Sequence, residues 1–475
     1  MSSNNQGFMC TDYLLLKPEE ATFIDLLKLL WCNDNKHFID SPFELVEELR
    51  RFRYRWLVFI SIVMMKLFLF IKTPMAYFGY VLEVWLNLVS DYGGIFKVVI
   101  NLINGKVSIP KRSSEKYRSM IGCLDQRIDL EPNIQMGQPK YEPALALMAA
   151  KIAYENSAFV QNVVENHFKM KLIGCYNFKN DYLGKDTTHA FISRNKDENN
   201  DLTVIAFRGT SPFDAQDWCT DFSISWYGLT GVGRVHGGFM KALGLQMENN
   251  YITKEINSNQ ENTQLFAYYT IKKIIKQICQ ENKNAKFIVT GHSLGGALAI
   301  LFASVLILHD EKELLDKLDG VYTFGQPRVG DENFGNFMVK KLKIYNVKYC
   351  RYVYCNDLVP RLPYDDKTLL FKHFGHCLYF NSLYHGKVLE EEPDKNYNSL
   401  IWIIPKYMNA WWELIRGFIY PRWKWGPNYK EGWCERVFRV IGLILPGLSA
   451  HGPQDYNNIT RLGHMAHNNL TFDRN

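Results

Sequence analysis

The chain has 475 residues, a formal net charge of +6 and a hydrophobic fraction of 47%. Its apolar content, with 30 Phe, 27 Tyr and 11 Trp, is sufficient to bury a core and excludes a disordered or fibrous protein. The net charge is small and no run of Lys and Arg is interleaved with aromatic residues, so a nucleic-acid partner is not indicated.

Ten cysteines are spread along the chain without a CxxC pair, so neither a metal site nor a cofactor is expected. The N-terminal residues are polar and lack the charged start, apolar core and cleavage site of a secretory signal. We therefore expect a cytosol-facing protein whose thiols stay free.

Residues 1–140 are expected to form a helical region that associates with a lipid surface. An apolar run at 57–71 follows a cluster of arginines, and a second apolar run continues after Pro74 to residue 89. A helix rises about 1.5 Å per residue, so the first run is shorter than the roughly 30 Å hydrocarbon core of a bilayer. Because proline interrupts a helix, we expect a hairpin near 57–89 that enters one leaflet. The cluster at its start comprises Arg50, Arg51, Arg53 and Arg55.

Such a hairpin also suits a lipid droplet (oil body), whose phospholipid monolayer covers oil and has no second aqueous side. We expect localisation at this surface, with the endoplasmic reticulum as a second location. The alternative is that both runs are buried core helices of an N-terminal domain. The polar residues 104–140, which include three prolines, are expected to link this region to the catalytic domain.

From Tyr141 onward, strand-like and helix-like segments alternate, and a domain is expected over 141–475. This alternation predicts an α/β fold, with a mostly parallel sheet and helices on both faces. Catalytic groups would then gather where the strands end. The predicted helices lie near 143–154, 264–282 and 297–308, and the predicted strands at 203–207, 287–289, 321–324, 349–354 and 377–380.

The Gly-x-Ser-x-Gly motif at 291–295 lies between a strand-like run and an apolar stretch of helical length. Together they predict a nucleophile elbow, in which Ser293 is exposed on a sharp turn before a helix. Gly291 and Gly295 are small because strand and helix pack closely around that turn. A flexible Gly-Ser turn is the alternative.

A serine hydroxyl is a weak nucleophile at neutral pH and needs a histidine as general base and a carboxylate to orient that histidine. In this fold type the chain order is Ser, then Asp or Glu, then His. Asp357 follows the predicted strand 349–354 and is the preferred acid, with a solvated turn aspartate as the alternative. His451, in a turn-like segment, is the preferred base and His376 the alternative. The remaining histidines after Asp357 are His373, His385, His464 and His467.

The oxyanion of a tetrahedral intermediate needs preorganised N–H donors. Leu294, next to the nucleophile, supplies one from its backbone. The second is expected from Thr210, which follows the predicted strand 203–207 and a turn permitted by Gly209. His236 precedes the serine in the chain and is interpreted as structural.

An insert near 391–436 holds six of the 11 tryptophans, interleaved with basic residues. Trp with Lys and Arg is a composition found at the level of lipid headgroups. Two interpretations remain open. The segment rests on a lipid surface beside the active site, or it forms a cap packed on the protein. The basic residues are Lys406, Arg416, Arg422 and Lys424.

Six ordered motifs resemble those of the class 3 lipase family: FRGT at 207–210, DW and TD within 217–221, VHGGF at 235–239, GHSLGG at 291–296, TFGQPRVGD at 323–331 and NDLVPRLP at 356–363. With the N-terminal apolar region and the Trp-rich insert, the chain resembles plant oil-body triacylglycerol lipases over nearly its whole length. The resemblance implies an α/β-hydrolase fold, a triad of Ser293, Asp357 and His451 without metal, and an oxyanion hole of Thr210 and Leu294. It also places residues 212–218 where fungal members carry a lid.

We therefore expect hydrolysis of the acyl esters of triacylglycerol, and also of di- and monoacylglycerol, at an oil–water interface through an acyl-enzyme. Two other functions remain open. A phospholipase A1 or galactolipase would use the same residues on membrane lipids. A catalytically inactive lipase-like scaffold would bind partners only, and a broken triad would be its mark.

Overall fold

The computed structural model describes residues 8–31, 37–41, 51–180, 184–197, 200–248, 250–256, 266–397, 399–423, 429 and 431–465. Within these ranges, the side chains of residues 197, 200 and 421–423 are not described. Arg50, Lys424, His467 and the side chain of Arg422 therefore lie outside the described part of the chain.

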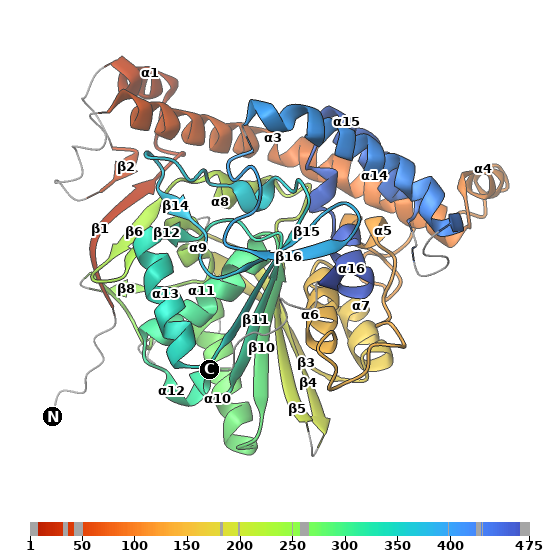
Figure 1. Cartoon of the computed structure of the whole chain (residues 1–475). Coiled ribbons are helices and arrows are strands. Elements are labelled where there is room, and N and C mark those ends of the chain that lie inside the picture. The colour runs from red at the N-terminus through yellow and green to blue at the C-terminus, as the bar shows by residue number, and fades with distance from the viewer. Residues whose placement is uncertain are drawn as a thin grey trace.

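A nine-stranded sheet forms the centre of the molecule (Figure 1). Its strand order is β17-β16-β15-β13-β11-β10-β5-β4-β3, and the five strands from β15 to β5 are parallel neighbours. The strands are β3 (Lys171–Asn180), β4 (Lys185–Asp197), β5 (Asn200–Phe207), β10 (Lys286–His292), β11 (Leu318–Phe324), β13 (Lys348–Tyr354), β15 (Cys377–Phe380), β16 (His385–Leu389) and β17 (His464–Met465).

Helices cover both faces of this sheet because alternate residues of its strands point to opposite sides. In β10, Phe287 and Val289 join the core with α10 and α11, whereas Ile288 joins the core with α6 and α16. These helices are α6 (Tyr141–Ile152), α7 (Ser157–Asn162) with the π-helical turn Val163–His167, α9 (Gly237–Ala242), α10 (Ala267–Glu281), α11 (Leu294–Leu308), α12 (Lys312–Leu315), α13 (Glu332–Ile344) and α16 (Pro453–Leu462). The strands and helices predicted for this domain, and its parallel sheet, are confirmed.

A second sheet includes the N-terminal residues and changes the expected division of the chain. Strand β1 (Phe8–Leu16) pairs with β6 (Trp226–Leu229), so residues before 140 are built into the domain that was expected to begin at 141. The other strands are β2 (Ile39–Asp40), β7 (Gly233–His236), β8 (Met247–Glu248), β9 (Tyr251–Ile252), β12 (Gly330–Asp331) and β14 (Phe371–Lys372).

The predicted hairpin near 57–89 is wrong, because residues Phe52–Asp91 form one continuous helix, α3, with Pro74 inside it. Proline removes one hydrogen bond of a helix. The helix continues because one side of it is packed on the protein on both sides of Pro74, from Tyr54 to Asn87. Neighbouring helices are α1 (Phe23–Trp31), α4 (Ile95–Ile103) and α5 (Met120–Leu124), and Asp125 of the expected linker is buried in bonds with Arg127.

The Trp-rich insert forms helices α14 (Ile403–Trp423) and α15 (Trp433–Ile444), which lie with α3 on one side of the molecule (Figure 1). Of the two interpretations left open for the insert, two of its basic residues favour the cap packed on the protein. Arg416 is fully buried and donates to Asp455 of α16 at 2.7 Å, and buried Lys406 pairs with Asp394 at 2.6 Å. The insert is therefore packed on the protein through buried charges. Short 3-10 turns occur at Val359–Arg361, Leu400–Trp402 and Ser449–His451.

Candidate active site

Ser293 occupies a strained turn between β10 and α11, with φ of 60° and ψ of −131°. Positive φ is costly for a residue with a side chain and marks a position that the surrounding structure must hold. The Ser293 N–H donates to the carbonyl oxygen of Phe324 at 2.9 Å. A Cβ at Gly291 would collide with the backbone of Gly295, and one at Gly295 with the carbonyl oxygen of Phe207. The geometry is that of the predicted nucleophile elbow.

His451 and Asp357 come together at the end of β13. The Nδ1–H of His451 donates to Asp357, with distances of 2.9 and 3.0 Å to its two carboxylate oxygens. Asp357 is fully buried and also accepts the Val359 N–H at 2.9 Å and the Tyr456 O–H at 2.5 Å. A buried carboxylate with three donors is held in one orientation, and it fixes His451 with Nε2 free to accept a proton.

His292 connects the elbow to this pair. Its Nε2 lies 2.9 Å from the carbonyl oxygen of His451, which can only accept, so Nε2 carries the proton. Burial, with His451 nearby, holds the pKa of His292 well below its usual value, and neutral Nδ1 therefore accepts the Tyr154 O–H at 3.0 Å. The His292 and His451 rings stack at 4.6 Å. No hydrogen bond joins the described side chains of Ser293 and His451, an arrangement that is common before substrate binds.

The other histidines considered have different surroundings. His376 is exposed just before β15. His373 is not bonded to Asp357, because its Nε2 donates to the carbonyl oxygen of Pro360. His236 accepts the Phe239 N–H at 3.3 Å and caps α9, which agrees with its interpretation as structural. His451 is thus the histidine that the fold brings to the candidate acid.

Thr210 lies in the loop after β5, and its hydroxyl is already engaged. It donates to Asp221 of α8 (Ala215–Phe222) at 2.6 Å. Because the hydroxyl already donates to Asp221, the backbone N–H is the Thr210 group that we consider as a donor to the oxyanion. Leu294 begins α11, where the first N–H groups of a helix have no intrahelical acceptor. Both candidate donors of the oxyanion hole therefore sit on rigid local structure.

Sequence reasoning missed four supporting residues. Tyr456 orients the acid, and Tyr154 donates to Nδ1 of His292. Gly325, with φ of +60°, lies against the pair, since a Cβ there would lie 2.9 Å from both Asp357 and His451. Asp221 holds Thr210. No pattern in a single sequence marks a tyrosine as the partner of a distant aspartate. Gly325 had a local signal, because it follows a predicted strand directly.

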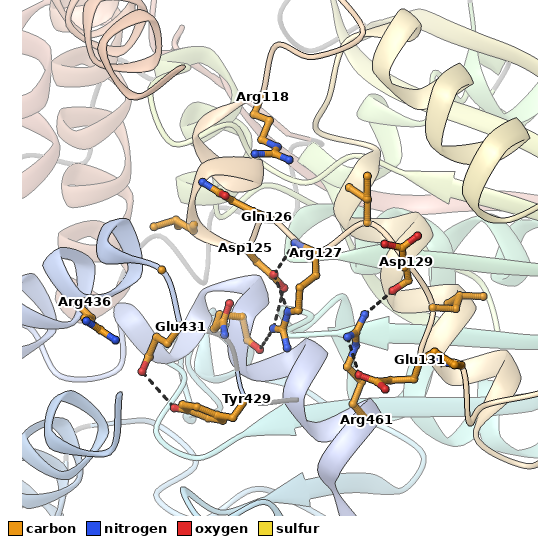
Figure 2. A pocket seen from close by; sticks show the side chains of 16 residues that line it. Arg118, Asp125, Gln126, Arg127, Asp129, Glu131, Tyr429, Glu431, Arg436 and Arg461 are labelled. Carbon is orange, nitrogen blue, oxygen red and sulfur yellow. Dashed lines mark hydrogen bonds and ion pairs between the residues drawn. The ribbon is translucent and has the colours of Figure 1, made fainter. Parts of the chain in front are cut away.

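A cavity of about 1080 Å³ lies on the other side of α16, between that helix, the residues after α5 and the start of α15 (Figure 2). The described residues that line it do not include Ser293, Asp357 or His451. Figure 2 shows several of its charged groups paired with one another, as in Arg127 with Asp125 and Arg461 with Glu131. This cavity is separate from the candidate catalytic residues.

Comparisons with known proteins show which proteins this chain is similar to. A family model described as Lipase (class 3) matches residues 204–367. Three proteins named Triacylglycerol lipase OBL1 are similar over most of their length. The one from Arabidopsis thaliana is 41% identical over 97% of this chain and 96% of its own. Those from Nicotiana tabacum and Ricinus communis are 41% and 37% identical, over 86% and 95% of this chain and 84% and 95% of their own.

The contact between Asp221 and Thr210 predicts a pH dependence of stability. Burial raises the pKa of Asp221 to about 7, although the Thr210 O–H favours the carboxylate. The unfolded chain releases this proton at lower pH, so ionisation costs the folded state progressively more stability as pH rises toward and through 7. Asp221→Asn keeps an acceptor for Thr210 without the charge. Its melting temperature, relative to that of the unchanged protein, should rise from pH 5 to pH 8, and a constant or falling difference would contradict the assignment.

Proposed function

The chain belongs to the class 3 lipase family, and on this premise we propose that it hydrolyses the acyl esters of triacylglycerol, and of di- and monoacylglycerol, at a lipid surface. The observation that carries this proposal is the Asp357–His451 pair, held beside a strained elbow serine in an α/β-hydrolase sheet. The similarity to triacylglycerol lipases over nearly the whole chain supports the choice of substrate.

We infer a two-step reaction through an acyl-enzyme. His451 Nε2 takes the proton from Ser293 Oγ as this oxygen attacks the ester carbonyl carbon. The negative charge that develops on the carbonyl oxygen is stabilised by the Thr210 and Leu294 N–H groups. His451 then gives its proton to the leaving glycerol oxygen. In the second step it takes a proton from water, which attacks the acyl carbon, and it returns this proton to Ser293 Oγ as the bond to this oxygen breaks and the fatty acid is released. The Asp357 carboxylate stabilises the imidazolium in both steps.

The proposed lipid surface is the apolar side formed by α3, α4, α14 and α15. Exposed large apolar residues are concentrated on these four helices, and Figure 1 shows α3, α14 and α15 on one side of the molecule. An apolar area of this extent on one side of a protein marks a site of interaction. Its most exposed members include Phe70 and Tyr77 of α3, Phe96 and Ile103 of α4, Ile404 and Trp411 of α14, and Ile444 of α15.

Helix α3 is long and apolar enough to cross a bilayer, judged by length and composition. Its inner side, however, is packed on α1, α5 and α8 along most of its length. A helix held in this way presents one side to lipid and lies along the surface. This orientation suits the monolayer of a lipid droplet, which we propose as its location.

Substrate class and nucleophile can be tested in one assay. Emulsified triacylglycerol, diacylglycerol, monoacylglycerol, phosphatidylcholine and galactolipid are offered in parallel to the protein and to Ser293→Ala, and fatty acid release is measured. We expect release from the neutral acylglycerols and a loss of about 10⁴-fold or more in Ser293→Ala, because the nucleophile is absent. Activity on the polar lipids alone would identify a phospholipase A1 or galactolipase, and no activity in the unchanged protein would favour a scaffold.

Adjacent tryptophans of α14 provide a matched pair for the lipid surface. Trp411 is exposed, whereas Trp412 packs inward and meets Tyr420 edge to face at 5.7 Å. In flotation with triolein droplets coated by phosphatidylcholine, Trp411→Ala should bind more weakly while its melting temperature is unchanged. Trp412→Ala should lower the melting temperature and still float with the droplets. Equal flotation of Trp411→Ala and the unchanged protein would show that α14 is not part of the lipid-binding surface. The side chain of Trp423, also in this insert, lies outside the described part of the chain.

A further inference from the structure

Helix α8 braces the loop that carries Thr210. Its Asp221 accepts the Thr210 hydroxyl at 2.6 Å. Its Asp217 is buried and accepts from Arg208 at 2.9 Å and from the Ser211 N–H at 3.1 Å, which tie down the loop on both sides of Thr210. Asp214 caps the helix by accepting the N–H groups of Gln216 and Asp217. The position of α8 therefore determines the position of the Thr210 N–H.

Helix α3 in turn seats α8. The buried Ser61 hydroxyl donates to the carbonyl oxygen of Phe222, at the end of α8, at 2.7 Å. The Cys219 sulfur lies 3.6 Å from the carbonyl oxygen of Met65, although its thiol is closer to the Ala215 carbonyl oxygen in α8, at 3.3 Å. Phe68 stacks on Trp218 with centroids 6.1 Å apart and also contacts Phe222. One side of α3 thus holds α8 along its length.

A second contact reaches the loop itself. Gly79 is buried in the second half of α3, and a Cβ at this position would collide with the side chain of Phe213. Phe78 packs edge to face on the same ring at 5.6 Å. Beside this contact, a cleft of about 460 Å³ separates α3 from residues 211–216. Phe213, three residues after Thr210, is therefore a bridge between α3 and the loop.

We propose that the inner side of α3 positions the oxyanion hole, through α8 and through the contact of Gly79 with Phe213. The proposal rests on the role of Thr210 given under the proposed function. Phe213 and Gly79 are positioning residues, since in this proposal each acts through the loop that carries Thr210. Because the outer side of the same helix carries exposed apolar residues, lipid that contacts α3 acts on the oxyanion loop through these contacts. A displacement of α3 therefore also displaces the loop that carries Thr210.

The contact can be tested with a double-mutant cycle. Gly79→Leu forces the ring of Phe213 away from α3, and we expect kcat for a water-soluble butyrate ester to fall about ten-fold or more with KM changed less than about two-fold. Phe213→Gly removes the whole side chain, including the Cβ that lies nearest to position 79, and should lower kcat by only about three-fold. Because the collision then has no partner, the double variant should resemble Phe213→Gly and not show the product of both losses. Ser90→Leu places the same side chain on α3 at an exposed position and should leave kcat unchanged.

Gly79→Ala and Ser293→Ala provide two further comparisons. Gly79→Ala adds only the Cβ and should show the same non-additivity at smaller amplitude, which serves if the Leu variant does not fold. An unchanged kcat in a folded Gly79→Leu, or a double variant that loses the product of the single losses, would overturn the proposal. If ester hydrolysis persists in Ser293→Ala, the proposed function itself fails. If hydrolysis depends on Ser293 but not on Gly79, only the positioning role of α3 fails.

Discussion

Burial of the Asp357 carboxylate is the constraint on which the rest of the site depends. An ionised carboxylate inside a protein is unfavourable unless each oxygen is hydrogen-bonded, and here His451, Tyr456 and the Val359 N–H supply the donors. These donors come from separate parts of the chain that must meet at the end of β13. The hydrogen bonds to this one carboxylate therefore hold the candidate base His451, the start of α16 and the turn after β13 in place together.

The Trp-rich insert is tied to the same region by a second set of buried charges. Asp455, the neighbour of Tyr456, accepts from Arg416 of α14 at 2.7 Å and from Arg439 of α15 at 3.0 Å. Burial opposes a charge on Asp455, but the two guanidinium groups outweigh it and lower its pKa. Helices that present apolar residues to the outside are thus anchored beside the helix whose Tyr456 donates to the candidate acid Asp357. A neutral hydrogen bond and aromatic packing join α3 to α8 and the loop of Thr210, so the candidate site is held at two places from the side that carries the exposed apolar residues.

Local patterns in the sequence predicted the parts of this protein that are determined locally. The elbow at Ser293, the strands around it and Asp357 after β13 follow from short runs of residues. The continuity of α3 past Pro74 could not be predicted, because it depends on packing against α8, far away in sequence. Arginine is usually a surface residue, yet Arg416 is buried because it pairs with Asp455 in the interior. The role of Tyr456 likewise exists only in the folded chain.

A crystal structure of the protein inactivated by a hexyl phosphonate ester tests the central claim most directly, because the adduct imitates the tetrahedral intermediate. We expect phosphorus bonded to Ser293 Oγ, the phosphonyl oxygen about 3 Å from the N–H groups of Thr210 and Leu294, and His451 Nε2 within hydrogen-bond distance of the serine oxygen. A phosphonate on another residue, or a phosphonyl oxygen turned away from both donors while His451 stays with Asp357, would contradict it.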